Sequence, residues 1–352
     1  MKIVVLAGGL SPERAVSLLT GTSVCKALRQ NGHRAILVDL FLGLEEVPAD
    51  LESLFDAQDG LCPDVRIEAV APDLAAVKAS RKDQSERRFG PNVLELCSLA
   101  DIVFLGLHGQ DGEDGRVQAA FDLLGIPYTG GGYLASGIAM NKAMTKRVMD
   151  SAGIPNAPWR DIPCYTVEDI PALMQELEVP CVVKAVNGGS SLGVALPDTK
   201  KELEKALHEM LRYGSHIIVE KKLMGRELTV AVLGDRALPA VEILPAEKDF
   251  DYAAKYQAGG ARELCPAPIT AEQQETMGTL ALKIHRTLGL EVYSRTDFIL
   301  DENGNFWCLE VNSLPGMTPA SLVPKEAAAV GMTYNELCEE IVRLSCGIRR
   351  RA

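Results

Sequence analysis

The feature that most constrains the fold is a pair of short strands near the end of the chain, separated by a polar turn. Residues 295–312 contain two apolar segments with an Asn-Gly dipeptide between them at 303–304, and such a dipeptide strongly favours a β-hairpin. Folding the chain about this turn brings Asp297 level with Glu310. The pattern therefore predicts two antiparallel strands that hold two carboxylates side by side.

The same hairpin predicts a cation site. Asn312 lies two residues after Glu310, so both side chains point to one face, where Asp297 and Arg295 join them. Oxygen ligands of this kind suit Mg2+ and the phosphates that it carries. The alternative interpretation is a solvated hairpin with ordinary surface acids.

The composition describes a globular protein of two or three domains. The chain has 352 residues, of which 47% are hydrophobic and 24% charged. Its net charge of −12 makes it a poor general binder of nucleic acid or of an anionic membrane. The nine cysteines are scattered without a Cys-x-x-Cys pair, which argues against a disulfide framework or a zinc site and favours a cytoplasmic location. No apolar run is long enough to span a bilayer.

The beginning of the chain predicts a doubly wound α/β domain. An apolar strand at 3–6 is followed by a Gly-Gly turn, and Ser11 is a good N-cap for a helix that runs to about Gln30. A second strand is expected at 34–40. Further on, residues 80–89 are dense in charge and are expected to form an exposed loop.

Three loops have the composition of ligand-binding segments. The acidic, glycine-rich loop 108–115 follows a buried strand, at the end where ligands bind in open α/β sheets. The Gly-Ser loop 187–193 follows a strand that ends in Lys184, and its backbone N–H groups can approach an anion closely, although many such loops are plain turns. The polar segment 249–260 is long enough to be a mobile flap.

A fourth segment resembles a nucleotide hinge. The strand 217–220 ends at Glu220, where backbone groups could contact an adenine edge, and Glu227 could hold ribose hydroxyls. For either glutamate alone, an exposed acid in a glycine turn is an equally good interpretation.

Taken in this order, the segments resemble the ATP-grasp superfamily, and within it the chain closely resembles the D-alanine–D-alanine ligase family. The resemblance covers nearly all of the chain except about residues 43–100, whose role stays open. The motifs that carry it are Gly8-Gly9 with Ser11-Pro12-Glu13-Arg14, His108-Gly109 with Gly112-Glu113-Asp114-Gly115, Tyr128-Thr129-Gly130, Asn141-Lys142, Gly189-Ser190-Ser191-Leu192-Gly193, Tyr252 with Ala254-Lys255-Tyr256, Glu310-Val311-Asn312, Pro315-Gly316-Met317-Thr318 and Ser321-Leu322-Val323-Pro324.

The resemblance implies an α/β (α+β) ATP-grasp fold with an N-terminal Rossmann-like, parallel-sheet domain. It divides the chain into an N-terminal domain at 1–132, a central ATP-grasp subdomain at 133–219 and a C-terminal subdomain at 220–352. It also implies a cytoplasmic homodimer with no nucleic-acid or membrane partner.

The resemblance also implies roles for individual residues. The residues expected to bind ATP are Lys142, Lys184, Ser191, Glu220, Lys221, Leu223, Glu227 and Lys255. Those expected to bind the two D-alanines or to serve the reaction are Glu13, His108, Ser190, Tyr256, Arg295, Gly316, Ser321 and Leu322. Those expected to hold two Mg2+ ions, or Mn2+ in their place, are Asp297, Glu310 and Asn312. A monovalent cation such as K+ is a further expected cofactor.

The implied reaction joins two D-alanines at the expense of ATP, through a D-alanyl phosphate, for peptidoglycan precursor synthesis. The nearest alternative keeps the fold and uses D-lactate or D-serine as the second substrate, and Tyr256 favours D-alanine. A non-catalytic ATP-grasp protein would not need Arg295. A dinucleotide-dependent oxidoreductase lacks its Gly-x-Gly-x-x-Gly run. Within the hairpin, Ser294 and Thr296 depart from the family pattern.

Overall fold

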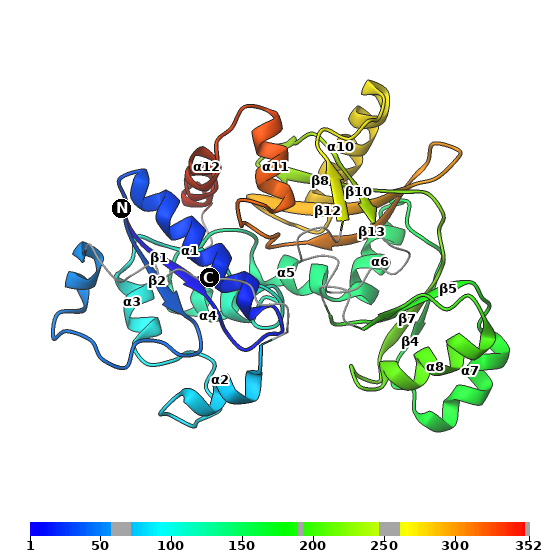
Figure 1. Ribbon diagram of the computed structural model, residues 1–352, viewed down its shortest axis with the longest axis horizontal. Coiled ribbons are helices and arrows are strands. Elements are labelled where there is room, and N and C mark those ends of the chain that lie inside the picture. Colours follow the sequence, from blue (N-terminus) through cyan, green and yellow to red (C-terminus); the bar gives the residue numbers. More distant parts are fainter. Residues whose placement is uncertain (58–71, 189–192, 246–260, 349–352) are drawn as a thin grey trace.

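Three parallel strands form the first sheet, in the order β2-β1-β3 (Figure 1). Their bounds are Lys2–Ala7 for β1, Arg34–Asp39 for β2 and Ile102–Leu105 for β3. Residues 3–7 are completely buried, as expected for a central strand in a sheet covered by helices. The computed structural model describes residues 1–57, 72–188, 193–245 and 261–348.

Helices from both ends of the chain surround this sheet. The C-terminal helix α12 packs beside α1, where Asn31 and His33 contact Glu339 (Figure 1). The elements around the sheet are α1 (Arg14–Gln30), η1 (Leu51–Asp56), α2 (Leu74–Ser80), α3 (Val93–Leu99), α4 (Arg116–Leu124) and α12 (Tyr334–Cys346).

Two sequence expectations in this region are wrong. Ser11 is not the helix N-cap, because α1 begins only at Arg14 with Glu13 as its N-cap, and the Ser11 hydroxyl instead donates to the carbonyl of His108 (2.7 Å). The segment 80–89 is a loop, but it is not wholly exposed. Arg81 is only 2% exposed, and its guanidinium lies 4.0 Å from the centre of the Phe41 ring while it donates to several backbone carbonyls of the loop.

An antiparallel sheet forms the central part of the chain, with the order β4-β7-β5-β6. Its core lies between the sheet and α7 and α8, while Ile218 on β7 packs with Ala143 of α6. The bounds are α5 (Tyr133–Met140), α6 (Lys142–Ser151), β4 (Trp159–Ile162), η2 (Val167–Asp169), α7 (Ile170–Glu176), β5 (Cys181–Ala185), β6 (Val194–Ala195), α8 (Lys200–Met210) and β7 (Ile217–Lys221).

The third sheet is antiparallel and contains the predicted hairpin at one end, in the order β11-β10-β8-β12-β13 with β9 beside β8. Helix α10 packs on this sheet, and α11 follows the hairpin (Figure 1). The bounds are β8 (Arg226–Leu233), β9 (Arg236–Ala237), β10 (Val241–Pro245), β11 (Ala261–Leu264), α10 (Ala271–Thr287), β12 (Tyr293–Leu300), β13 (Phe306–Asn312) and α11 (Leu322–Ala329).

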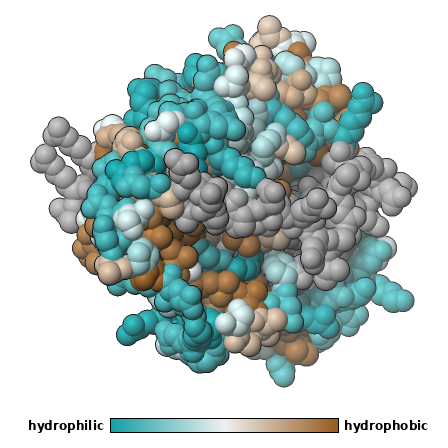
Figure 2. Space-filling model, turned by 60° about the vertical axis from the view of Figure 1, so that its left-hand side comes forward, coloured by the Kyte–Doolittle hydropathy of each residue, from teal (hydrophilic) through white to brown (hydrophobic). Residues whose placement is uncertain are grey.

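The visible surface is largely polar. The face drawn in Figure 2 is mostly hydrophilic, with apolar patches mainly in its lower half. Within the described residues, no helix combines the length and the apolar character needed to cross a bilayer.

Candidate active site

The hairpin folds in the register that the sequence predicts. Asp297 on β12 pairs with Glu310 on β13, and Arg295 pairs with Asn312. The strand pairing shifts just after Asp297, which marks an irregularity in the ladder next to the acids. The hairpin thus places two carboxylates opposite each other at the wall of a cavity.

This cavity has a volume of about 400 Å³ and is lined by residues of the N-terminal domain, such as Glu13 and His108, and of the third sheet, such as Arg295 and Glu310. It is of the size that small-molecule ligands occupy. Of the residues expected to be functional, the cavity brings together Glu13, His108, Lys142, Glu227, Arg295, Asp297, Glu310, Asn312, Gly316, Ser321 and Leu322. Lys184, Glu220, Lys221 and Leu223 do not line it, and Ser190, Ser191, Lys255 and Tyr256 lie outside the described residues.

Arg295 and Asp297 form a two-pronged ion pair in the cavity wall. The guanidinium Nε and Nη2 atoms each donate to one oxygen of Asp297, both at 2.9 Å. Burial lowers the pKa of Arg295, but the Asp297 carboxylate more than offsets this, so the net pKa is raised and the side chain stays charged. Asp297 also accepts a hydrogen bond from the Thr229 hydroxyl on β8. The arginine is therefore held rigidly, with its remaining N–H groups available to a ligand.

The acids of the hairpin fit a hard divalent cation. Two carboxylates that face each other across a strand pair repel, and a cation between them or beside them relieves that repulsion. Asn312 adds an amide oxygen on the same face, and its Nδ2 lies 3.4 Å from Asp297. The described part of the chain contains no cluster of three His, Cys, Asp or Glu residues suited to a metal, so a cation here would need oxygens from a bound phosphate as well.

A buried cluster of two lysines and one glutamate lies behind the cavity. Glu220 on β7 is 2% exposed, and its two oxygens lie 3.1 Å from Lys146 Nζ and 2.9 Å from Lys184 Nζ. Burial raises the pKa of Glu220, but the two ammonium groups lower it by a larger amount. The net pKa is therefore lowered, and the carboxylate stays ionised. The interpretation of Glu220 as an exposed turn acid is therefore wrong.

Other predicted nucleotide residues are placed around this cluster. Lys142, the first residue of α6, donates to the carbonyl of Gly188 at the start of the Gly-Ser loop. Lys221 and Leu223 follow Glu220, with the Lys221 side chain exposed, and Glu227 lines the cavity from β8. Of these residues, Lys142 and Glu227 line the cavity, whereas Lys221 and Leu223 do not.

The N-terminal domain supplies the opposite wall with Glu13 and His108. The His108 ring accepts from or donates to the Thr20 hydroxyl through Nε2 (3.1 Å), and its Nδ1 lies 3.5 Å from Glu113. Burial lowers the pKa of His108, but Glu113 and then Glu13 raise it, and the net pKa is raised. Gly109 must lack a side chain here, because its φ is +71° and a Cβ would lie 2.7 Å from Glu13.

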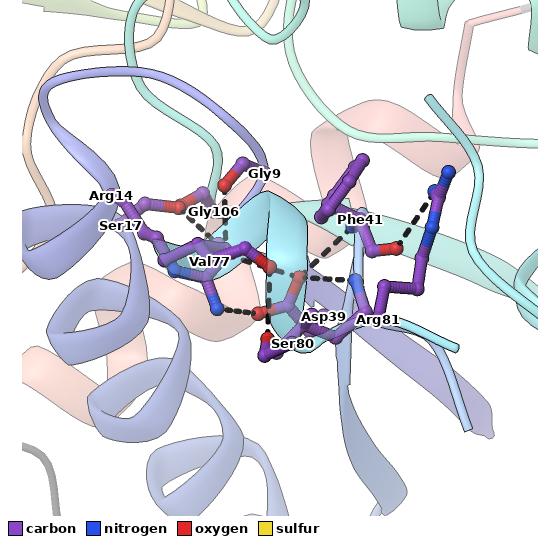
Figure 3. Close-up of polar contacts among 11 residues, drawn as sticks. Gly9, Arg14, Ser17, Asp39, Phe41, Val77, Ser80, Arg81 and Gly106 are labelled. Carbon is purple, nitrogen blue, oxygen red and sulfur yellow. Dashed lines mark hydrogen bonds and ion pairs between the residues drawn. The ribbon is translucent and has the colours of Figure 1, made fainter. Parts of the chain in front are cut away.

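The turn that carries Glu13 is anchored by a buried ion pair. Figure 3 shows Arg14 reaching Gly9 and Asp39, and Asp39 accepting from the backbone N–H of Phe41. Arg14 Nη1 donates to the Gly9 carbonyl at 2.7 Å and to Asp39 at 3.2 Å. In dinucleotide-binding folds an acid at this strand end binds a ribose. Here Arg14 occupies that acid, which removes the structural basis of the oxidoreductase alternative.

The segment after the hairpin closes the cavity near Arg295. Ser321 is the N-cap of α11, and its hydroxyl accepts from the Thr318 backbone N–H at 3.1 Å and contacts the Thr318 hydroxyl at 2.7 Å. Gly316 packs against the same serine, since a Cβ there would be 3.0 Å from its Oγ. With Leu322, these residues place a helix N-terminus and backbone N–H groups at the cavity, an arrangement that suits an anion.

Several residues with interactions at this site are not singled out by the sequence. Lys146 follows Lys142 by one helical turn, and this spacing is its one sequence signal. Its partner Glu220 is distant in sequence, so the pairing becomes visible only in the folded chain. The same is true of Asp39 with Arg14, and of Glu326, which contacts β8 through the Ala231 backbone.

Glu326 on α11 is completely buried close to the hairpin. One of its oxygens accepts the backbone N–H of Ala231 on β8, and the other has no hydrogen-bond partner among the described residues. Burial raises the pKa of Glu326 well above its ordinary value, and although the Ala231 N–H and Arg295 lower it, the net pKa stays raised. A carboxyl of this kind is costly to keep ionised.

Replacing Glu326 by glutamine should therefore stabilise the fold in a pH-dependent way. The carboxyl has a higher pKa in the folded chain than in the unfolded chain. As the pH rises above the pKa of the unfolded state, the carboxyl therefore lowers the free energy of unfolding by an increasing amount, whereas glutamine does not titrate. We expect E326Q to gain about 1–3 kcal/mol at pH 8 and much less at pH 5, measured by urea unfolding. The control is E204Q on the exposed face of α8, which should change neither value. An equal effect of E326Q at both pH values would contradict this account.

Comparisons with known proteins identify the family to which the chain belongs. Residues 2–131 match the family model described as D-ala D-ala ligase N-terminus, and residues 148–343 match the model described as D-ala D-ala ligase C-terminus. A D-alanine–D-alanine ligase of Lacticaseibacillus casei is 41% identical over 97% of this chain and 95% of its own length. One from Pediococcus pentosaceus is 40% identical over 97% of each chain.

Solved structures of D-alanine–D-alanine ligases are similar to this chain over almost its whole length. A crystal structure of D-alanine–D-alanine ligase from Bacillus anthracis complexed with ATP has a TM-score of 0.73 and 28% identity, covering 99% of this chain and 98% of its own. The ligase from Coxiella burnetii has a TM-score of 0.74 and 25% identity, covering 99% and 94%. With its parallel N-terminal sheet, its ATP-grasp architecture and both family models matched, this chain belongs to the D-alanine–D-alanine ligase family.

Proposed function

We propose that the chain is an ATP-dependent ligase that joins two D-alanine molecules into D-alanyl-D-alanine, a precursor for peptidoglycan. The observation that carries the proposal is the single cavity that joins Glu13 and His108 on one wall to Arg295 and the acids of the hairpin on the other. Related proteins over the full length are named D-alanine–D-alanine ligases, and a neighbouring structure contains ATP. The cavity thus offers charged side chains to D-alanine on one wall and to the phosphates of ATP, with their metal, on the other.

The first step activates a carboxylate, which is a poor electrophile. Glu13 would hold the ammonium group of the first D-alanine, with His108 close to its carboxylate. An oxygen of that carboxylate attacks the γ-phosphorus of ATP, the bond to the bridging oxygen breaks, and D-alanyl phosphate and ADP form. Lys142 and Lys184 would neutralise the α and β phosphates, and Lys255, which lies outside the described residues, would reach the γ phosphate.

The second step forms the amide. The carboxylate of the second D-alanine would lie at Ser321 and Leu322, at the N-terminus of α11. Its amine, once deprotonated, attacks the acyl carbon, and phosphate leaves with the oxygen that it received. Arg295 and the backbone N–H at Gly316 would stabilise the negative charge on the tetrahedral oxygen.

Asp297, Glu310 and Asn312 would hold two Mg2+ ions, or Mn2+, and a metal bound there supplies charge neutralisation for the transferring phosphoryl group. The nucleoside would lie along Glu220, Lys221 and Leu223, with Glu227 on the ribose. Among residues outside the described part of the chain, Ser191 would contact the phosphates of ATP, and Ser190 and Tyr256 would lie near the first D-alanine. A bound K+ ion, a homodimer and a cytoplasmic location are also part of the proposal. The division at 132 and 219 is also kept as a proposal.

The proposal is tested by measuring ATP-dependent phosphate release with D-alanine alone. We expect release well above the background without amino acid, with one D-alanyl-D-alanine formed per phosphate. Adding D-lactate or D-serine should change neither the rate nor the product. A mixed product formed in preference would identify the alternative second substrate, and release no greater than background would contradict the proposal.

A further inference from the structure

Lys146 is buried at the edge of the cavity, where its ammonium group donates two hydrogen bonds and forms an ion pair with Glu220. It is 3% exposed on α6, and its Nζ lies 3.1 Å from Glu220 Oε1, 3.1 Å from Asn156 Oδ1 and 3.4 Å from the carbonyl oxygen of Ala157. Two of these contacts, to Asn156 and Ala157, are hydrogen bonds, and the third is the ion pair with the Glu220 carboxylate. The side chain is therefore held in one position.

Lys184 approaches the same carboxylate from the other side. It lies on β5, which pairs with β7, and Val182 rather than Lys184 is directly opposite Glu220. Lys184 and Glu220 are thus diagonal neighbours on one face of the sheet, and Nζ of Lys184 lies 2.9 Å from Oε2. The carboxylate is shared, with one oxygen for each lysine.

The charge of the cluster follows from this sharing. Two ammonium groups and one carboxylate leave a net charge of +1 behind the cavity. If Lys146 were absent, the carboxylate would be left to Lys184 alone, and the remaining pair would be neutral. A neutral pair attracts a polyphosphate less than a cluster with one excess positive charge.

We propose that Lys146 is a positioning residue for nucleotide binding, which takes up one oxygen of Glu220 so that the ammonium group of Lys184 stays available to the phosphates of ATP. This role rests on the proposed ATP-dependent activity. It acts through Glu220, without requiring contact between Lys146 and the nucleotide. It explains why a second lysine is buried one helical turn after Lys142.

The test is a double-mutant cycle on ATP affinity. We expect Lys146→Met to raise the Kd of ATP by about tenfold and the KM for ATP similarly, with the KM for D-alanine changed little. Adding Glu220→Gln to this variant releases Lys184, so the double variant should bind ATP more tightly than Lys146→Met alone. The matched control is Arg147→Met, which removes the exposed ion pair with Asp161 from the next position of α6 and should leave the Kd of ATP unchanged.

A second comparison keeps the inference testable even if Lys146→Met alone does not fold with Glu220 partly unpaired. In the Glu220→Gln background, Lys146→Met should change the Kd of ATP by less than about twofold, because its effect passes through Glu220. A further loss of affinity in that background would mean that Lys146 contacts the nucleotide itself, and would overturn the inference. Absence of ATP binding in the wild-type protein would instead contradict the proposed function, so the two failures are distinguishable.

Discussion

Replacing Arg295 by methionine is expected to lower kcat by at least about a hundredfold while the Kd of ATP changes by only a few-fold. The guanidinium is oriented by two 2.9 Å hydrogen bonds to Asp297, so its position is set before substrate binds. It would stabilise the oxyanion of amide formation, where charge develops only during the reaction, and methionine cannot replace that charge. Stopped-flow or steady-state phosphate release, with ATP affinity measured separately, distinguishes the two effects.

A matched control for this variant lies on the adjacent strand. Arg226 on β8 makes a similar two-pronged pair with Glu242, at 2.6 and 2.8 Å, but it is not a residue of the cavity wall. Arg226→Met should therefore keep kcat close to wild type. Unchanged turnover in Arg295→Met would refute the role of Arg295 in the reaction.

Replacing Glu310 by glutamine is expected to lower kcat by about a thousandfold and to raise the Mg2+ concentration needed for half-maximal rate. The change keeps the shape of the side chain and removes the charge that faces Asp297 across the strands. A neutral amide is a weaker ligand for a hard cation, so the metal that neutralises the transferring phosphoryl group would bind poorly. The measurement is phosphate release as a function of Mg2+ concentration, with and without prior treatment with a chelator.

The control for this change is Glu302→Gln on the same hairpin. Glu302 is exposed in the turn, so the identical chemical change there should alter neither kcat nor the Mg2+ dependence. If Glu310→Gln keeps the wild-type Mg2+ dependence, Glu310 is not a metal ligand.

The hairpin is predictable from sequence because its determinants are local. The Asn-Gly turn and the alternation of side chains together set the register, and the structure confirms the pairing of Asp297 with Glu310. The strand–turn–helix opening is predictable for the same reason, although the start of α1 is not, since Ser11 donates to His108, which is distant in sequence. A tertiary contact can therefore change the residue at which a helix begins, even when the local sequence contains an N-cap motif.

The buried charges are the part that sequence does not predict. The buried cluster combines side chains from three different elements: Glu220, Lys146 and Lys184. Each is a charged residue type that is usually found at the surface. Arg81 lies in a charged segment that predicts exposure. It is nevertheless buried against Phe41, and its guanidinium donates hydrogen bonds to backbone carbonyls of its own loop. Such residues are stabilised by partners that become neighbours only after folding.

In the proposed reaction the carboxylate of the first D-alanine receives a phosphoryl group in this cavity before the amide forms. The most direct measurement uses D-alanine labelled with 18O in its carboxylate, together with ATP and Mg2+, and follows the isotope in the released phosphate by mass spectrometry. We expect one 18O atom in each phosphate released with D-alanyl-D-alanine, because the attacking oxygen leaves with the phosphorus. Formation of the dipeptide with unlabelled phosphate would contradict it.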